Sequence, residues 1–340
     1  MEDIKPFIEI SRTKLKQASI LWAEGFREAC CLHRVVLLCY RSKKLLIRTG
    51  QCFLLNGFIF LGSLFVLNSV VIPILQWILP DHYTQTGCAE MSEFHGVFRF
   101  YSFLRGFLIQ LFYVFWFYPL YVFSFILSNL WYNDIATHGF AAMGRSGPSV
   151  VESSKQNDKL TSDSKAHAAR PAGLGGIMIG IGEQVYSVLL LTFFFLEVYA
   201  TGFIPYVGKA LNFVLLSWMY AYYCFEYKWN FTEWGLEKRL DFFETNWAFF
   251  AGFGSPCVLA IFFFSPLVGY GLMAILFPLF VLTATGTEAE QVTSARRRRF
   301  SGADELGKLP IFYAADTLLM RVLSLLPSES QGRMQDDKTL

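Results

Sequence analysis

Long apolar stretches without charge constrain this chain more than any other feature of its sequence. Residues 53–79, 107–131 and 247–286 contain no charged side chain, and residues 186–227 are nearly as apolar. A helix needs about 20 apolar residues to cross the roughly 30 Å hydrocarbon layer of a bilayer. Only 16% of the residues are charged, whereas soluble domains carry about 25%. The sequence therefore predicts an all-α membrane protein.

The apolar blocks predict about six transmembrane passes, because the last two blocks have twice the length of one span. The six spans are expected within a membrane domain that covers 52–286, near 53–79, 107–131, 186–207, 210–228, 247–264 and 266–284. Each double block is either two full spans or a re-entrant helical hairpin, which is tolerated where protein buries the backbone. Proline and glycine residues in 247–286 favour broken or tilted helices there.

The basic residues predict the orientation in the membrane. If both termini are cytosolic, 26 of the 29 Lys and Arg residues lie on the cytosolic side, as the positive-inside rule requires. Segments 1–51 and 287–340 are therefore expected in the cytosol, together with a Ser- and Lys-rich loop at 141–171 that is expected to be disordered. Because the N-terminus is polar, insertion is expected to use an internal signal anchor.

An amphipathic helix is predicted within the N-terminal segment 1–51. Its apolar side chains follow helical spacing and are Leu15, Ala18, Trp22, Phe26 and Ala29. Two interpretations stay open. The helix lies on the cytosolic leaflet, or it packs against the cytosolic face of the helical bundle.

Polar side chains at the edges of the spans are the candidate site residues. Glu226 and Lys228 lie in the aromatic run SWMYAYYCFEYKWNF, and Glu244 and Asn246 precede the last block. Glu226 reads as an anchor at the cytosolic end of the fourth pass, where aromatic residues form an interfacial belt. Lys228, Lys238 or Arg239 are its candidate partners.

Two further acids, Glu197 and Asp134, are candidate site residues. Glu197 lies about a dozen residues into a span, and an intramembrane carboxyl group is a functional-site hypothesis by default. The structural alternatives are a protonated acid that shares a hydrogen bond, or an acid brought to the interface by helix tilt. Asp134 follows the second span and is interpreted as a helix-terminal cap.

A run of four arginines precedes a serine in RRRRFS. Arg296, Arg297, Arg298 and Arg299 are candidates to bind anionic lipid headgroups, which contribute roughly 1 kcal/mol per basic residue near the surface. Ser301 is a candidate phosphorylation site for a kinase that prefers upstream arginines. A stop-transfer charge block that fixes topology is the alternative interpretation.

Other motifs do not support enzyme chemistry. GLGGIMIGIGE at 173–183 lacks the preceding strand that a phosphate loop requires. The seven cysteines and five histidines show no metal-ligand spacing, and no nucleophile–base set or paired acid is evident. No metal or other cofactor is expected, and the aromatics lie inside the spans, which argues against nucleic acid as a partner. The sequon NFT at 230–232 falls on the predicted cytosolic side, where it stays unglycosylated.

Four short elements resemble those of a known family. They occur in the same order as in that family and in the same membrane context. They are WYNDIA (131–136), YCFEYKW (223–229), ETNWAFFAGFGSP (244–256) and LFPLF (276–280). In these elements the chain resembles the etoposide-induced protein 2.4 family, which shares a domain with CysZ-type sulfate permeases. The loop at 141–171 and the arginine run depart from the animal branch, which indicates a plant-type or otherwise divergent member.

The resemblance implies a multi-pass protein of the endoplasmic reticulum membrane that is linked to autophagy. The expected function is therefore non-enzymatic support of autophagy, and membrane contacts are one candidate location. The lipid bilayer is an expected partner, and the protein partners are unknown. Two alternatives stay open: a transporter or channel for a small anion such as sulfate, and a lipid-handling or scaffolding subunit of a membrane complex.

Overall fold

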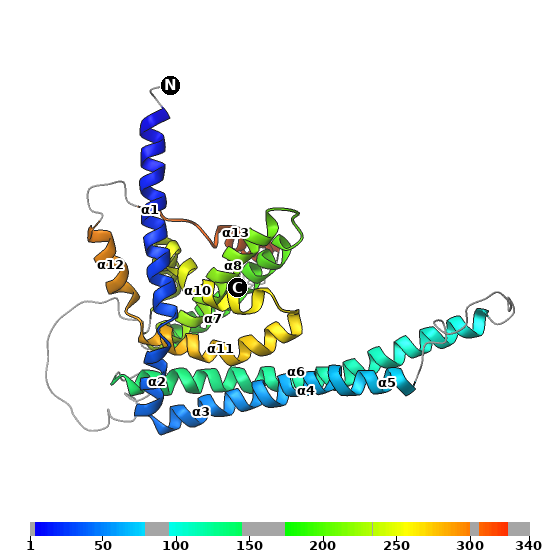
Figure 1. Ribbon diagram of the computed structural model, residues 1–340. Helices are drawn as coiled ribbons and strands as arrows, with labels where there is room; N and C mark the ends of the chain where they lie inside the picture. Colours follow the sequence, from blue (N-terminus) through cyan, green and yellow to red (C-terminus); the bar gives the residue numbers. More distant parts are fainter. Residues whose placement is uncertain (1–3, 79–94, 145–173, 233, 300–305, 326–340) are drawn as a thin grey trace, which may run out of the picture. The chain divides into compact units, whose positions relative to one another are not determined.

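A computed structural model describes the chain in five segments (Figure 1), which are 4–78, 95–144, 174–232, 234–299 and 306–325. These residues form helices and turns and contain no β-strand, which confirms the all-α prediction. They divide into two compact units. Unit 1 comprises 1–31, 146–258 and 287–340, and unit 2 comprises 32–145 and 259–286.

Unit 2 is built from a continuous helical run and two further long helices. The run begins after α2 (Leu32–Arg41), and consists of α3 (Lys43–Phe53), η1 (Leu54–Leu61), α4 (Gly62–Val66), η2 (Leu67–Val71) and α5 (Ile72–Ile78). Ser42 caps its start by accepting a hydrogen bond from the backbone N–H of Leu45. The two long helices are α6 (His95–Ala142) and α11 (Pro266–Gly286).

The helical run of unit 2 lies beside α6 (Figure 1), and α11 packs against both. Phe60, Leu64 and Phe117 form the buried contact, with Tyr121 and Tyr270 packed around them. Most side chains on the run and on α6 face outward, including Phe58 and Phe115. Exposed aromatic and aliphatic side chains on this scale are expected of a protein whose solvent is lipid.

Three helical stretches, all in unit 2, are long and apolar enough to cross a membrane: Lys43–Ile78, Phe100–Ala142 and Val268–Gly286. They support a membrane protein with several spanning helices. The α6 helix, at 48 residues, extends well beyond the expected span 107–131. Its last turn includes residues 141 and 142 of the loop expected at 141–171; residues 145–171 of that loop lie outside the described residues.

Unit 1 contains the remaining helices of the described chain, with its boundary to unit 2 inside α10. They are α1 (Ile4–Ala29), α7 (Leu174–Thr201), α8 (Gly208–Phe231), α9 (Leu236–Thr245), α10 (Trp247–Phe262), α12 (Ala289–Arg299) and α13 (Tyr313–Leu325). The last two lie within 287–340, so helices form in a segment for which the sequence predicted only a tail.

Two features of unit 1 bear on the expected spans. The chain turns by 88° between α9 and α10, so this pair is either a broken span or a re-entrant segment. The α7 helix has 28 residues and includes the apolar stretch Val185–Thr201. Length and composition thus give three spanning helices, or four with the bent pair, among the described residues; six passes remain a prediction.

The α1 helix packs directly on the backbone of α10. A side chain on Gly252 would place its Cβ 1.9 Å from the carbonyl oxygen of Trp22, and one on Gly25 would meet the Phe249 carbonyl oxygen at the same distance. Such contacts occur only where glycine lets two helices approach closely. Of the two interpretations of this amphipathic helix, packing against the protein is therefore the one that the structure shows.

The buried side of α1 differs from its predicted apolar face. Gln17, Leu21, Glu24 and Glu28 are buried, whereas Leu15 is exposed. The acids face inward because basic and hydroxyl groups of unit 1 meet them, as described below. Helical periodicity of apolar residues predicted the helix correctly but not the face that packs.

Aromatic rings fill the core of unit 1 around the element YCFEYKW. Phe225 lies edge-to-face on Phe250 and Phe253, and Tyr222 packs in the same way on Trp229 and Phe243. Such pairs contribute roughly 0.5–1.5 kcal/mol beyond burial of their area. The aromatic residues of this element are thus core side chains of unit 1 as well as candidates for an interfacial belt.

Candidate functional site

Basic side chains of unit 1 tie together segments that lie far apart in sequence, and we call this group the polar junction. Lys228 Nζ, at the end of α8, donates a hydrogen bond to the carbonyl oxygen of Thr287. Arg297 donates to the carbonyl oxygen of Thr245 over 2.6 Å. Carbonyl groups at helix ends lack partners within the helix, so these two cations satisfy the backbone where chain segments meet.

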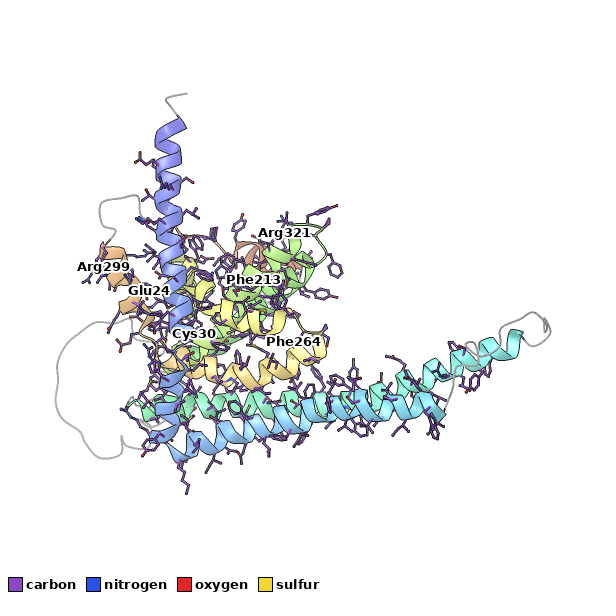
Figure 2. The ribbon with its side chains drawn as sticks, viewed as in Figure 1. Glu24, Cys30, Phe213, Phe264, Arg299 and Arg321 are labelled. Carbon is purple, nitrogen blue, oxygen red and sulfur yellow. The ribbon has the colours of Figure 1, made fainter. Side chains whose placement is uncertain are left out.

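The acids of α1 complete the polar junction. Arg296 pairs with the buried carboxylate of Glu24, which also binds Arg27 at 2.6 Å. The hydroxyl of Thr287 donates to Glu28 Oε2 over 3.3 Å. Figure 2 shows Glu24 on α1 and Arg299 on α12. Buried carboxylates cost several kcal/mol unless they are paired and hydrogen-bonded, which explains why α12 is held against α1.

Glu244, at the end of α9, holds the segment that leads into α13. Its Oε1 atom accepts a hydrogen bond from the backbone N–H of Phe312 at 3.1 Å, and its own carbonyl oxygen accepts from Leu309 N–H. Lys308 Nζ lies 2.8 Å from Asp241 Oδ1 and 3.4 Å from Glu244 Oε2. The hydrogen bond to Asp241, with a smaller contribution from Glu244, raises the pKa of Lys308.

Glu226 is half-buried on α8, and the structure selects among its three candidate partners. Lys228 turns to Thr287, and Lys238 lies over the Trp234 ring with Nζ 4.0 Å from the ring centroid. Arg239 interacts electrostatically with Glu226 while it donates to the Trp234 carbonyl oxygen at 2.7 Å. Glu226 on α8 thus lies within electrostatic range of Arg239 on α9.

Two other candidate residues have a buried atom that lacks a partner among the described residues. Asn246 lies at the bend between α9 and α10, where its Nδ2 donates to the carbonyl oxygen of Phe242 and its Oδ1 accepts no hydrogen bond. Glu197 lies in α7 with its Oε2 buried and equally without a donor. Glu197 lies outside the polar junction, and its role stays a prediction.

Asp134 was interpreted as a helix-terminal cap, and this interpretation is wrong. The α6 helix continues for eight residues beyond it, because Ile135 and Ala136 are buried and extend the packed face. Asp134 Oδ2 instead lies 3.3 Å from Arg48 Nε on α3. Both side chains are about two-fifths exposed, so the pair contributes at most about 1 kcal/mol.

A buried polar cluster in unit 2 was not anticipated from the sequence. Asn56 is fully buried in η1. Its Oδ1 atom accepts from Ser124 Oγ at 2.5 Å, and its Nδ2 atom donates to Ser128 Oγ at 3.0 Å and to the Ala274 carbonyl oxygen at 3.4 Å. The cluster joins η1, α6 and α11.

Pro278 explains why the Ala274 carbonyl oxygen is available to this cluster. In an α-helix that oxygen would accept from the N–H four residues later, and proline has none. Asn56 Nδ2 and the hydroxyl of Tyr132 occupy it instead, the latter at 3.0 Å. A polar side chain inside a membrane helix thus satisfies the backbone that a proline leaves open.

An acidic cleft of about 340 Å³ is the second site that sequence analysis missed. Its lining combines apolar side chains with the carboxylates of Glu237, Glu244 and Asp316. The hydroxyl of Tyr186 donates a hydrogen bond to Asp316, which joins α7 to α13. The three acids come from α9 and α13, more than 60 residues apart, so no local pattern could have united them.

The arginine run divides between two roles. Arg296 and Arg297 are held by Glu24 and by the Thr245 carbonyl oxygen, whereas Arg298 and Arg299 are exposed. Binding of lipid headgroups therefore stays a prediction that concerns Arg298 and Arg299 above all. Ser301 lies outside the described residues.

The comparisons with known proteins bear on the family. A family model described as "Sulfate transporter CysZ/Etoposide-induced protein 2.4", the EI24 model, matches residues 31–286. A protein of Arabidopsis thaliana named Protein EI24 homolog is 66% identical over 319 residues, which cover 94% of this chain and 98% of that protein. The chain belongs to the EI24 family. Its similarity to a plant protein agrees with the prediction of a plant-type member.

Two more distant relatives are also similar in sequence to this chain. A Protein EI24 homolog of Dictyostelium discoideum is 26% identical over 90% of this chain and 84% of its own. Ectopic P granules protein 4 of Caenorhabditis elegans is 26% identical over 169 residues, or 49% of this chain and 46% of that protein. Comparison with solved structures finds no match.

Proposed function

We propose that this chain is a non-enzymatic, multi-pass protein of the endoplasmic reticulum membrane that supports autophagy. The observation that carries the proposal is its 66% identity, over nearly the whole of both chains, with an EI24 homolog. The Caenorhabditis elegans relative supports the link to autophagy, because its name refers to ectopic P granules. Granules that persist in the wrong place are what a defect in their removal would produce.

The chemistry of the described sites fits a structural role. The polar junction and the Asn56 cluster satisfy backbone carbonyl groups and buried carboxylates within the protein. These contacts join helices that lie far apart in sequence, which supports a role in assembly. We therefore propose that both groups of contacts serve the assembly of the helices. The cytosolic segments are connected to these helices.

Partners of the chain are proposed from exposed chemistry. The bilayer surrounds the apolar helices, and anionic headgroups pair with Arg298 and Arg299, each worth roughly 1 kcal/mol. The distribution of Lys and Arg supports a cytosolic location for both termini. Protein partners within the autophagy machinery would bind the cytosolic segments. Membrane contacts are one candidate location for this binding.

A small-anion transporter is the second candidate, and the description of the matching family favours it. An anion path would be expected to present basic side chains or helix N-termini. The buried polar residues described in unit 2 are Thr, Asn and Ser, without a Lys or Arg among them. A lipid-handling or scaffolding subunit is the third candidate, and purified complexes without transport activity would favour it.

Two measurements test the proposal. Deletion of the gene in its own cells is expected to slow autophagic flux, and a tagged chain is expected to co-localise with an endoplasmic reticulum marker. Normal autophagic flux in the deleted cells would contradict the proposed role in autophagy. Purified protein in liposomes is expected to give no sulfate flux; flux above that of empty liposomes would favour the transporter instead.

A further inference from the structure

The α13 helix follows the polar junction in sequence, and its surface does not match that of a cytosolic tail. Leu318, Val322 and Leu325 recur at helical spacing and are exposed by 47%, 43% and 81%. Ala315 and Leu319, which are buried, occupy the adjacent side of the helix. The apolar arc of α13 is therefore wider than the strip that packs on the protein.

The contacts of α13 place it beside an apolar helix. It packs on α7, where Tyr186 donates to Asp316. The ring of Phe312, just before α13, packs at a tilt against Phe194 with ring centroids 5.0 Å apart. Tyr186 and Phe194 are eight residues apart, which is about 12 Å along a helix. The start of α13 thus lies alongside the first two turns of the apolar stretch Val185–Thr201.

The same stretch of α7 is exposed on another side. Val188, Phe195 and Leu196 are each at least half exposed, and they belong to a helix whose composition suits a bilayer. Side chains of this kind require lipid or protein around them. The exposed apolar arc of α13 accordingly continues an apolar surface that α7 already presents.

By helical spacing, Thr317 and Ser324 lie on the side of α13 away from its apolar arc. The hydroxyl of Thr317 donates to the carbonyl oxygen of Tyr313, and that of Ser324 donates to the carbonyl oxygen of Arg321, both over 2.7 Å. Asp316 is engaged by Tyr186. Arg321 (Figure 2) is exposed beside the apolar arc, where a long basic side chain can extend to the headgroups.

From these contacts we infer that α13 is an interfacial membrane helix, with Leu318, Val322 and Leu325 inserted among the acyl chains of the cytosolic leaflet. Its partner is the lipid bilayer. The polar side, with Ser324 and Thr317, faces the headgroups and water. This inference places part of the predicted tail 287–340 in the membrane surface and leaves the C-terminus itself in the cytosol.

Site-specific fluorescence tests the inference on the full chain in lipid nanodiscs. In a background without reactive cysteines, Val322→Cys and Ser324→Cys are each labelled with the environment-sensitive dye NBD. The two positions are neighbours in sequence, both are exposed, and they point to opposite sides of α13. Both substitutions are small, and Leu325→Cys repeats the first on a second residue of the apolar arc.

We expect lipids that carry a doxyl quencher on the acyl chain to quench the dye at Val322 and Leu325 more than at Ser324. Aqueous iodide should show the reverse order. Equal iodide quenching at the two sides would overturn the inference, because α13 would then lie in water. Protection of Val322 from both quenchers would also overturn it, since a protein surface or a second copy would then cover the apolar arc.

Discussion

Asn56 Nδ2 donates a hydrogen bond to the carbonyl oxygen of Ala274, the oxygen that Pro278 leaves without its helical partner. The two residues are 218 positions apart in sequence. Their contact ties a π-helical turn of the first apolar run to the last apolar helix of unit 2. A π-helical turn is rare and frequently marks a functional site, and here it positions one amide group between three helices.

Asn56→Ala should destabilise unit 2. The substitution removes a donor from the Ala274 carbonyl oxygen and leaves the hydroxyl of Ser124 without its 2.5 Å acceptor. Loss of partners for buried polar groups costs about 1–3 kcal/mol. Thermal unfolding of the purified protein in detergent measures the effect as a lower Tm.

Asn129→Ala is the matched control for Asn56→Ala. Asn129 also lies on a helix of unit 2, but it is exposed and donates to the Phe125 carbonyl oxygen of its own helix. This control should leave Tm nearly unchanged. An equal loss of Tm in both variants would show that the Asn56 cluster is no stronger than a surface hydrogen bond.

Gly252→Ala should separate α1 from α10. The added methyl carbon would lie 1.9 Å from the carbonyl oxygen of Trp22, which is backbone and cannot turn away. Overpacking of this kind costs about 1–3 kcal/mol or more. Trypsin should then cleave α1 faster at Lys14 and Lys16, as read from the N-terminal fragments by mass spectrometry.

Gly106→Ala provides the comparison, since a Cβ there meets no heavy atom within 4 Å. An alanine inside α6 should be neutral or stabilising by up to about 1 kcal/mol. If Gly252→Ala left α1 as resistant to trypsin as Gly106→Ala does, the close contact between α1 and α10 would be refuted.

Glu244→Ala should loosen the segment before α13. It removes the acceptor of the Phe312 N–H and one of the two carboxylates near Lys308. Hydrogen bonds to a charged group contribute about 1.5–3 kcal/mol. Hydrogen exchange of the amides at 306–313 should accelerate, and trypsin should cleave sooner after Lys308.

The control for Glu244→Ala is Glu237→Ala on the same helix. Glu237 lines the acidic cleft but is exposed, so its removal should leave exchange at 306–313 unaltered. Faster exchange in the Glu237 variant alone would contradict the role assigned to Glu244.

Glu197→Gln should leave the Tm and the abundance of the protein unchanged or slightly higher. Its Oε2 atom is buried and accepts no hydrogen bond from the described residues, and a neutral amide avoids the cost of a charge in an apolar helix. The variant is compared with the wild type by detergent unfolding and by rescue of autophagic flux. Full abundance without rescue would instead identify Glu197 as a functional residue.

The fold class and family of the chain could be predicted because their signals are local. Charge-free runs such as 107–131 indicate a lipid environment from their composition alone. The family element YCFEYKW is equally local, because its aromatic residues lie within two turns of one helix. The bounds were less accurate. Asp134 resembled a helix cap because polar residues follow Trp131, yet the packing of Ile135 and Ala136 carries α6 onward.

Neither the Asn56 cluster nor the acidic cleft could be predicted, because each depends on contacts between distant segments. Pro278 did signal an open carbonyl group at Ala274, but nothing local identified Asn56 as its donor. Similarly, no local pattern predicts that Glu24 and Glu28 are buried. Their burial follows from Arg296 and Thr287, some 260 residues later, which no periodicity reports.

The most direct test of the central proposal is rescue in the plant that carries the 66% identical EI24 homolog. Arabidopsis thaliana plants without that homolog would express this chain at matched abundance, and autophagic flux would be measured as turnover of a tagged autophagosome marker with and without a vacuolar inhibitor. The proposal predicts that flux falls in the mutant and that this chain restores it. Normal flux in the mutant, or a fall that a fully abundant and correctly localised chain does not correct, would contradict a role in autophagy.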